Sequence, residues 1–479
     1  MSGLPSGWTP AKLSELAEFN PKHDVRLDRT MKVAFVPMPA VDANAGEIVA
    51  AVDRSLGEVW KGFTHFADDD VIFAKITPCM ENGKIAVASD LTNGRACGST
   101  EFHVLRSRGG VLPRYLWRFL RQQSFRREAE GAMTGAVGQR RVPTDYLREQ
   151  ALPVPPLAEQ RRIVAKLDAL SARTARAQAD LDRVPALAEQ QRRAVLSAAF
   201  SGRLTAEWRV HKSSLPAAAP RPHELIRRKY VPGIDAPFTA PYETPATWTW
   251  LALPQLGDLD RGKSRHRPRN DRRLFGGPYP FVQTGEVRAA DRYLSTYTQT
   301  YSDFGLAQSR LWKPGTVCIT IAANIAETAI LAIDACFPDS VVGFVADDER
   351  AMPEYIEYFM RTARSDLARF APATAQKNIN LDTLAVVRVP VPPPEEQREV
   401  VRRIDSAFAE IDRLVAEAAA ARRLLDHLDQ AILVKAFRGE LVPQDPADEP
   451  ASVLLERIRA ELATATVKPV RRGRATAAA

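Results

Sequence analysis

The feature of this 479-residue sequence that most constrains its fold is an internal repeat, because a chain that contains one unit twice folds as two related units. The segment 152–168 (LPVPPLAEQRRIVAKLD) recurs at 389–405 (VPVPPPEEQREVVRRID), an offset of 237 residues. The same offset relates AFSGRL at 199–204 to AFRGEL at 436–441. Two separate blocks at one unchanged offset indicate a duplicated rear part of fixed length.

Upstream of these blocks the similarity persists, but its spacing drifts. Trp8 matches Trp248 at an offset of 240 residues, and Phe35 matches Phe281 at an offset of 246. Insertions and deletions therefore separate the two copies in their first parts. Each copy has a variable front and a rear of constant spacing.

The rear parts have the periodicity of long helices. Apolar residues of the second copy alternate spacings of four and three over about four heptads, which predicts a helix that packs on another helix. These residues are Val400, Ile404, Ala407, Ile411, Leu414, Ala418, Ala421, Leu425, Leu428 and Ile432. The expected partner is the rear helix of the other copy; the alternative is that each helix packs on its own front. Pro185 should kink or break the first of these helices.

The ends of both helices are predicted by proline and glycine. The Pro-rich entries should delay the helices until Ala158 and Glu395, and Gly202 and Gly439 should end them. The pairs Glu159-Gln160 and Glu396-Gln397 lie in the first helical turns and are interpreted as complements to the positive helix ends. Phe200 and Phe437 are expected to be packing anchors near the helix exits.

The fronts are predicted to be mixed α/β domains. Segments rich in β-branched and aromatic residues predict strands at 32–38, 70–76, 84–89, 100–106, 278–283, 315–322 and 328–334. Amphipathic helices are expected at 115–123 and 355–363. The resulting division is a first domain 1–150, a helical region 151–205, a linker 206–240, a second domain 241–388, a helical region 389–441 and a polar, partly disordered tail 442–479, with one short surface helix at 452–462.

Composition adds few constraints. The net charge of +8 is compatible with nucleic-acid binding. The four cysteines, Cys79, Cys97, Cys318 and Cys336, have the spacing of neither a disulfide framework nor a zinc site and are expected to be buried thiols. No apolar run is long enough to span a bilayer, and the start of the sequence lacks a basic segment followed by an apolar one. We therefore expect a cytoplasmic protein.

The repeated motifs resemble the specificity subunit of type I restriction-modification systems. The resemblance rests on a twice-repeated order of a variable region, a Q-[KR]-x-[VI] turn, a P-V-P-P-x-x-E-Q-R entry, a long helix and an A-F-x-G-x-L exit, and it covers nearly the whole chain. GSTEFHVLR (98–106) and LPQLGDLDRGKS (253–264) are also similar to target-recognition segments of that family.

The resemblance implies an α+β fold in which two target recognition domains are joined by long antiparallel coiled-coil helices with a pseudo-two-fold internal repeat. Each domain would recognise one half of a bipartite, asymmetric site in double-stranded DNA. The helices would set the half-site spacing and dock two methyltransferase subunits, and two motor-nuclease subunits would complete the enzyme. This chain would bind no cofactor and catalyse no reaction, because S-adenosylmethionine, ATP and Mg²⁺ act through the other subunits.

The densest basic stretch is 261–273 (RGKSRHRPRNDRR), in which seven of thirteen residues are Lys or Arg. Its Pro and Asn residues favour a loop, and guanidinium groups bind phosphates and guanine edges. The alternative is a solvated loop that does not meet DNA. The predicted DNA contacts of the second copy are Lys263, Arg265, Arg267, Arg269 and Arg272, followed by Gln283 and Thr284 as candidates for base edges.

In the first copy, Lys75 and Thr77 lie at the end of an expected strand. Gln139, Arg140 and Arg141 lie in the turn that aligns with Gln376, Lys377 and Asn378. The family position of this turn implies DNA contact, whereas the alternative is that the glutamines only bond backbone at the domain-to-helix junction. Arg121, Arg126 and Arg127 are either phosphate contacts or ordinary surface residues.

Catalytic alternatives lack their motifs. Residues 257–264 match the G-x-x-x-x-G-K-[ST] pattern for phosphate binding, but two aspartates inside it would repel phosphate. A stand-alone DNA adenine methyltransferase would need a Gly-x-Gly-type loop and an Asn/Asp-Pro-Pro-aromatic motif, and the sequence contains neither. A coiled-coil protein scaffold is the non-enzymatic alternative.

Overall fold

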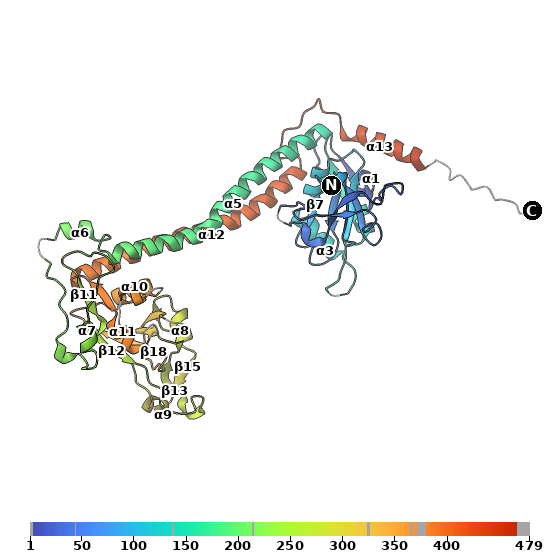
Figure 1. Cartoon of the computed structure of the whole chain (residues 1–479). Coiled ribbons are helices and arrows are strands. Elements are labelled where there is room, and N and C mark those ends of the chain that lie inside the picture. Colours follow the sequence, from blue (N-terminus) through green and yellow to red (C-terminus); the bar gives the residue numbers. More distant parts are fainter. Residues whose placement is uncertain are drawn as a thin grey trace, which may run out of the picture. The chain divides into compact units, whose positions relative to one another are not determined.

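The computed structural model describes residues 3–43, 45–136, 138–212, 215–322, 326–364, 367–370 and 380–466. It contains two compact units, the first formed by residues 1–182 and 419–479 and the second by residues 183–418. Each unit therefore combines one variable domain with parts of both long helices (Figure 1).

The long helices are α5 (Leu157–Phe200) and α12 (Pro394–Phe437), each of 44 residues. Each begins one residue earlier than expected, because proline is tolerated in a first helical turn. Of the predicted kink or break at Pro185, the break is wrong, since α5 is continuous through this residue, and the kink stays a prediction. Proline removes one N–H donor, and the remaining turns of α5 keep their own hydrogen bonds.

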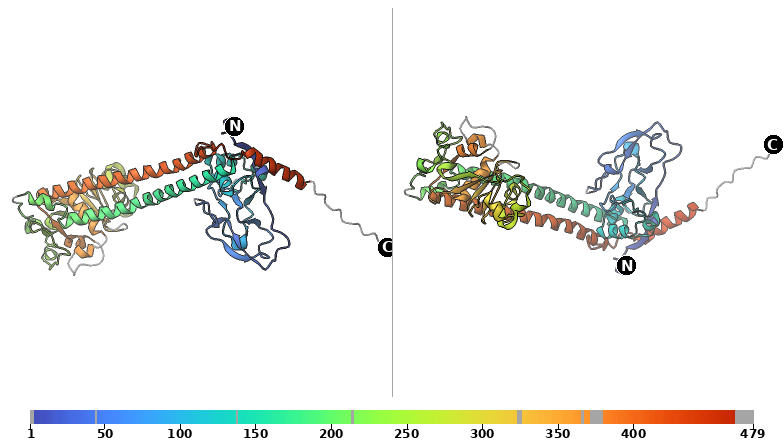
Figure 2. Two further views of the ribbon diagram at one scale, coloured as in Figure 1. Left: turned by 90° about the horizontal axis from the view of Figure 1, so that it is seen from above. Right: turned by 90° about the horizontal axis from the view of Figure 1, so that it is seen from below.

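The helices pack against each other in antiparallel orientation within each unit, as predicted (Figure 2). In the first unit Thr174 bonds Asp429 at 3.0 Å and Gln178 bonds Asp426 at 3.2 Å. In the second unit Arg192 forms an ion pair with Asp412. Residue numbers that rise along α5 are thus matched by numbers that fall along α12.

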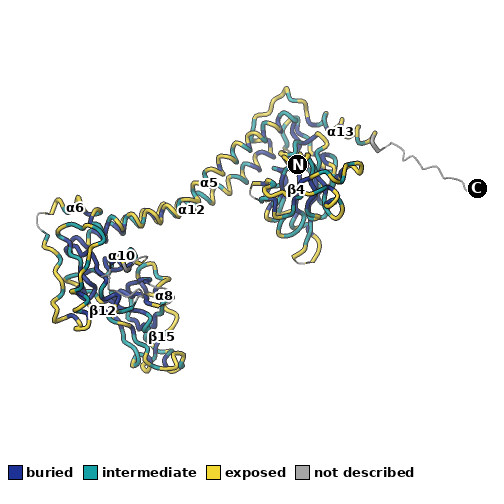
Figure 3. The backbone as a smooth tube through the Cα atoms, viewed as in Figure 1, coloured by how far each residue is buried: buried dark blue, intermediate teal, exposed yellow. Residues whose placement is uncertain are grey.

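The apolar residues with heptad spacing in α12 are buried less evenly than the sequence pattern suggests. Val400 and Ile404 are fully buried against the second domain, whereas the side chains of Leu414 and Leu428 are 48% and 47% exposed. Figure 3 shows the same contrast, with buried residues concentrated in the two domains and few along the middle of the helices. Two helices alone cover only part of each other's circumference, so burial is deepest where a domain adds a third layer.

The first unit contains two four-stranded sheets, which confirms the mixed α/β prediction. The strands of one, in spatial order, are β2 (Ala17–Phe19), β9 (Phe102–Ser107), β6 (Val71–Ala74) and β7 (Ile85–Val87). Those of the other are β4 (Val52–Ser55), β3 (Lys32–Val36), β8 (Arg95–Gly98) and β5 (Thr64–Ala67). Only β3 and β8 pair in parallel. The helices of this domain are α1 (Leu13–Leu16), α2 (Pro113–Leu120), α3 (Gln123–Gly131) and α4 (Thr144–Glu149).

The second unit contains one five-stranded sheet and two two-stranded sheets, one of which comprises β13 (Phe275–Phe281) and β15 (Gln299–Tyr301). The larger sheet has the order β12 (Gly257–Arg261), β18 (Val341–Ala346), β16 (Val317–Thr320), β17 (Thr328–Leu331) and β14 (Tyr293–Leu294). Helix α10 (Pro353–Ala363) packs on this sheet and fills the position that α2 has in the first unit. The short helices α8 (Thr284–Ala289), α9 (Asp303–Ala307) and α11 (Leu381–Val386) complete the domain.

A short antiparallel strand pair attaches each domain to its helix entry. In the first unit it comprises β1 (Thr9–Lys12) and β10 (Ala151–Val154), and in the second β11 (Thr249–Ala252) and β19 (Arg388–Val391). The registers are equivalent, because Thr9 faces Val154 and Thr249 faces Val391. The duplication therefore extends from the sequence to the hydrogen bonds between strands.

Two segments outside the repeat also pack on the units. The expected linker 206–240 contains α6 (Ala206–Val210) and α7 (Val231–Ile234) and buries Ile226 and Tyr230 in the second core. The helix expected at 452–462 is present as α13 (Ala451–Thr466), and its Leu455 packs in the first core. Within the described residues, no helix has both the length and the apolar character that a membrane span requires.

Candidate nucleic-acid interface

Each variable domain is held to its long helix by a buried tryptophan–glutamate hydrogen bond. The indole Nε1 of Trp8 donates to Glu159 Oε2 at 3.0 Å, and that of Trp248 donates to Glu396 Oε2, also at 3.0 Å. Both glutamates are fully buried, with 1% and 0% exposure. We call each set of contacts around this pair a junction. Glu159 and Glu396 therefore do more than complement the positive helix ends, because they also join each domain to its helix.

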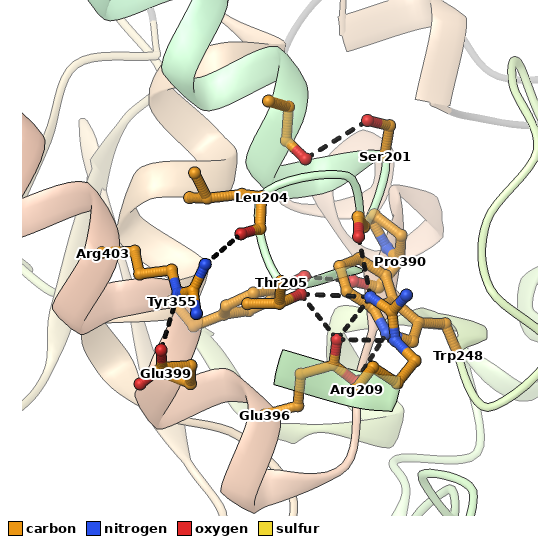
Figure 4. Close-up of polar contacts among 12 residues, drawn as sticks. Ser201, Leu204, Thr205, Arg209, Trp248, Tyr355, Pro390, Glu396, Glu399 and Arg403 are labelled. Carbon is orange, nitrogen blue, oxygen red and sulfur yellow. Dashed lines mark hydrogen bonds and ion pairs between the residues drawn. The ribbon is translucent and has the colours of Figure 1, made fainter. Parts of the chain in front are cut away.

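The second junction is shown in Figure 4. Glu396 accepts a further hydrogen bond from Thr205 Oγ1 at 2.7 Å and forms an ion pair with Arg209 at 2.6 Å. Because Thr205 and Arg209 follow the C-terminal end of α5, this carboxylate connects the start of α12 to the end of α5. A buried carboxylate that accepts several hydrogen bonds avoids most of the cost of desolvation.

The first junction has a weaker partner at the same place. Gln444 Nε2 approaches Glu159 Oε1 at 3.3 Å and donates to the Gly439 carbonyl at 2.6 Å. Burial raises the pKa of Glu159, while the hydrogen bonds from Gln444 and Trp8 oppose this shift. A neutral amide here replaces the guanidinium of the second junction.

The glutamine after each glutamate bonds backbone on both sides of the junction. Gln160 accepts from the Leu112 amide at 2.8 Å and donates to the Gly110 carbonyl at 3.1 Å. Gln397 accepts from the Met352 amide at 2.9 Å and donates to the Arg350 carbonyl at 2.8 Å. These glutamines therefore fix the segment that precedes α2 or α10.

At each junction, a phenylalanine at the C-terminal end of one long helix packs on a tyrosine of the domain attached to the other long helix. Phe200, at the end of α5, lies 5.3 Å from the ring of Tyr355, and Phe437, at the end of α12, lies 4.9 Å from the ring of Tyr115. The two tyrosines donate to the carbonyls of Pro390 and Pro153 at 2.5 and 3.0 Å. The predicted role of Phe200 and Phe437 as packing anchors is confirmed.

The candidate DNA contacts of the first domain come together at the end of β6. The Thr77 amide donates to the Arg140 carbonyl at 3.0 Å, and the Val142 amide donates to the Lys75 carbonyl at 2.8 Å. The strand end at residues 75–77 and the turn at 139–141 therefore form one polar surface, although the sequence separates them by more than sixty positions.

Within this surface the two arginines have different surroundings. Arg141 donates to both carboxylate oxygens of Glu101, at 2.9 and 2.8 Å, and this contact lowers the pKa of Glu101. The side chain of Gln139 is exposed. Arg140 is half-buried, and its one described ion pair, with Glu130, is long at 3.7 Å. Thr77 donates to Glu81. Gln139 and Arg140 are therefore more available to a ligand than Arg141 or Thr77.

The basic stretch of the second domain is a loop, as predicted. It runs from the end of β12 at Arg261 to a 3₁₀ turn at Arg272–Leu274. Arg269 forms an ion pair with Asp339 at 2.9 Å, and Arg267 donates to the Ser264 carbonyl at 2.6 Å. Arg265 and Arg272 are exposed, and Lys263 is half-buried. The loop therefore combines arginines held in place with arginines that face solvent.

The remaining candidates differ in their surroundings. Gln283 caps α8, and its side chain donates to Gln299 at 3.1 Å. Thr284 is the first residue of α8 and is half-buried. Gln376, Lys377 and Asn378 lie outside the described residues.

The phosphate-loop pattern at 257–264 has no loop geometry. Gly257–Arg261 is strand β12, which pairs with β18 along its length. Asp260, inside the pattern, forms ion pairs with Arg227 at 2.8 Å and Arg310 at 3.1 Å. A strand whose carboxylate faces two guanidinium groups cannot cradle phosphate with backbone N–H groups, in agreement with the sequence analysis.

One buried group of potential metal ligands exists among the described residues, formed by His23, His65 and Cys97. His65 Nδ1 accepts from the His23 amide at 3.2 Å, so a metal ion on this nitrogen would have to replace that N–H. His65 Nε2 faces the Trp60 carbonyl and His23 Nε2 faces the Ala96 carbonyl, each at 2.9 Å. Burial lowers the pKa of His23 to about 4. The geometry is that of a hydrogen-bonded core of neutral imidazoles.

The thiols are mostly where the sequence analysis places them. Cys97, Cys318 and Cys336 are buried, and burial raises the pKa of each. Cys79 is only half-buried, because it lies in the turn after the end of β6.

The sequence analysis did not identify the junctions. The signal was nevertheless present, because Trp8 and Trp248 recur in front of the repeated Glu-Gln pairs. A residue type that recurs near the start of both copies indicates a contact that both copies share, here a buried hydrogen bond. Arg209 has no such counterpart and could be found only from the structure.

A model of the type I restriction modification DNA specificity domain matches residues 5–186 and 245–417. The specificity subunit of the Escherichia coli type I restriction enzyme EcoAI is 40% identical over 168 residues, which are 35% of this chain but only 28% of that relative. The EcoKI specificity subunit of Escherichia coli strain K12 is 27% identical over 390 residues, covering 79% of this chain and 77% of the relative.

Two solved structures have the same fold. The HsdS subunit from Thermoanaerobacter tengcongensis matches with a TM-score of 0.66 at 23% identity, over 91% of this chain and 98% of that one. A chain from a structural study of complex assembly and conformational transition of the type I R-M system matches with a TM-score of 0.65 at 22% identity, over 92% and 100%.

Proposed function

Because this chain belongs to the type I restriction modification DNA specificity family, we propose that it is the DNA-recognition subunit of a type I restriction-modification complex. Each domain, 1–150 and 241–388, recognises one half of a bipartite and asymmetric site in double-stranded DNA. The subunit itself is non-catalytic.

The observation that carries this proposal is that two equivalent junctions hold two unlike surfaces. The Trp8–Glu159 and Trp248–Glu396 contacts are equal in length, so the domains are attached in the same way. The arginine-rich loop 261–273 of the second domain has no counterpart in the first. The same tryptophan–glutamate attachment with different polar surfaces is expected when the two half-sites differ.

We assign the DNA contacts to residues whose charged or amide groups are accessible. In the first domain these are Gln139 and Arg140, with Lys75 beside them and with Thr77 and Arg141 in supporting contacts. In the second domain they are Lys263, Arg265, Arg267, Arg269 and Arg272 of the basic loop, and Gln283 and Thr284. The turn residues Gln376, Lys377 and Asn378, which lie outside the described residues, are added because they align with Gln139, Arg140 and Arg141 in the repeat.

The helices set the distance between half-sites and dock two methyltransferase subunits. With 44 residues at about 1.5 Å per residue, each helix is about 66 Å long. This is about twice the length of one helical turn of DNA, which is about 34 Å. Two motor-nuclease subunits complete the restriction enzyme in the cytoplasm. S-adenosylmethionine, ATP and Mg²⁺ bind to these partner subunits.

Salt-dependent DNA binding tests the proposal. Fluorescence anisotropy of labelled duplexes would be measured with the chain and its methyltransferase subunit at several salt concentrations. Because phosphate contacts release counterions, the logarithm of the binding constant should fall linearly with the logarithm of salt concentration, and by several units of slope. Binding that ignores salt and shows no preference for a bipartite site would contradict the proposal.

A further inference from the structure

The first unit has a cleft lined by four arginines, which we call the arginine cleft. It lies between α2, α3 and the parts of α5 and α12 that belong to this unit, and its volume is about 430 Å³. The arginines that line it are Arg114, Arg118, Arg121 and Arg126. A volume of this size lies within the range that binds small molecules.

Three of these guanidinium groups surround the buried ring of Trp117. They belong to Arg114, Arg118 and Arg121, and they lie 5.6, 4.6 and 4.9 Å from the ring centre. Trp117 is 4% exposed, and its Nε1 donates to the Ile85 carbonyl at 2.8 Å. The ring therefore holds the cations together through cation–π contacts and itself cannot rotate.

The carboxylates of the cleft do not reach all four cations. Asp168 accepts from Arg118 at 2.7 Å and from Arg114 at 3.1 Å. Among the described residues, Arg126 donates one hydrogen bond, from its Nη1 to the Glu81 carbonyl at 2.6 Å, and its buried Nε has no partner. Burial lowers the pKa of Arg126. A half-buried guanidinium without a carboxylate favours the entry of an anion.

Two tight turns leave room for these side chains. A Cβ atom on Gly83 would lie 2.9 Å from Arg126 Nη1, and one on Gly46 would lie 2.2 Å from the Trp117 ring. Both glycines have positive φ, of 77° and 69°. A side chain at either turn would therefore overlap with Arg126 or Trp117.

The repeat supplies an internal comparison. The equivalent cleft of the second unit, of about 610 Å³, contains three arginines, each paired with a carboxylate. Arg292 pairs with Asp405, which aligns with Asp168 of the first unit, and Arg361 pairs with Glu357. Arg192 pairs with Glu189 and Asp412. In the second cleft each arginine is thus paired with a carboxylate of the chain, whereas Arg126 of the first cleft has no carboxylate partner among the described residues.

We infer that the arginine cleft binds a phosphate group through Arg126 and Arg118. Guanidinium forks match the oxygen geometry of phosphate and donate charge-assisted hydrogen bonds to it. The phosphate belongs either to a small molecule that enters the cleft or to a DNA backbone that passes its mouth. Glu47, Asp168 and Asp429 also line the cleft and offset part of its positive charge.

Calorimetric titration of the full chain with inorganic phosphate, adenosine monophosphate and a short DNA duplex tests this inference. Arg126→Gln should weaken binding of the true ligand by about tenfold to hundredfold, the usual effect of losing a hydrogen bond to a charged group. Arg127→Gln is the matched control, because Arg127 is exposed on the same turn of α3. Arg126→Lys, which keeps the charge and the fold, should retain part of the binding.

The outcomes separate the two sources of phosphate. Binding of phosphate or the nucleotide that is lost in Arg126→Gln assigns a small molecule, whereas an effect on the duplex alone assigns the DNA backbone. Equal effects of Arg126→Gln and Arg127→Gln, or no effect of either variant on any probe, would overturn the inference. Because free phosphate is tested separately, failure here would leave the proposed DNA recognition untouched.

Discussion

Arg140 and Arg141 are neighbours whose guanidinium groups have different tasks. Arg141 is held by both oxygens of Glu101, whereas the described ion pair of Arg140, with Glu130, is long at 3.7 Å. A guanidinium held by both oxygens of a carboxylate positions the turn, whereas one in a long, weak ion pair can exchange that partner for a phosphate.

Arg140→Gln should therefore reduce the salt slope of DNA binding by about one unit and weaken binding to all sequences alike. The slope is obtained from anisotropy titrations over a range of salt concentrations. Arg413→Gln is the control, since Arg413 is an exposed residue of α12 that pairs with Glu410 and Glu417. If Arg140→Gln and Arg413→Gln have the same slope as the wild type, Arg140 is not a phosphate contact.

His23 makes the first unit sensitive to acid. Burial lowers its folded-state pKa to about 4, below the unfolded value of about 6.5. Between these values the unfolded state binds more protons, so stability rises with pH, is complete above about 6.5 and is lost as pH falls toward 4. His23→Asn should flatten this dependence of the melting temperature between pH 4.5 and 7, while His211→Asn, on an exposed residue, should leave it unchanged.

At the scale of elements, the junctions decide how a domain is attached to its helix. Trp248→Phe removes the N–H that Glu396 accepts and leaves a fully buried carboxylate with one partner fewer. We expect a loss of about 1–3 kcal/mol in the unfolding free energy, measured by denaturation of the full chain. Trp250→Phe, in strand β11, replaces an indole that stacks on Phe370 by a smaller ring and removes no hydrogen bond to a buried carboxylate among the described residues. It should cost less; an equal cost would contradict the role of the junction.

The glycines that end the long helices also support the junctions. Gly439 has a φ of 76°, and a Cβ atom there would lie 2.3 Å from Pro5 Cγ. Gly439→Ala should therefore cost both backbone strain, about 1–2 kcal/mol, and a steric clash. Gly109→Ala measures the strain alone, because its φ is 93° and no atom lies within 4 Å. The melting temperature should fall further for Gly439→Ala than for Gly109→Ala.

Sequence patterns predicted the elements well because each depends on local periodicity. The seven expected strands, helices α2 and α10 and the exits at Gly202 and Gly439 follow from side-chain alternation and from backbone requirements of proline and glycine. The junctions depend on contacts across about 150 positions, which periodicity does not encode. Pro185 failed as a predicted break because the cost of one missing donor is small beside the bonds of a 44-residue helix.

At the scale of the whole molecule, the two domains are attached to their helices by the same tryptophan–glutamate contact but differ in their polar surfaces. The sequence predicted this division from the constant and drifting offsets of the repeat. It could not distinguish Arg140 from Arg141, because the difference depends on which carboxylates lie nearby in space. Nor could it find that Arg126 lines a cleft, because the cleft is formed by segments far apart in the sequence. Accessible charge is a property of packing, and packing brings together residues from distant segments.

The central claim is that two different domains recognise two halves of one asymmetric DNA site. Mapping methylated adenines in cells that contain this chain and its methyltransferase subunit tests it most directly. We predict one non-palindromic motif in two parts, separated by a fixed number of unspecified bases, and a change in only one part when Gln139→Ala alters the first domain. A single continuous motif, a palindrome, or a change in both parts would contradict the account.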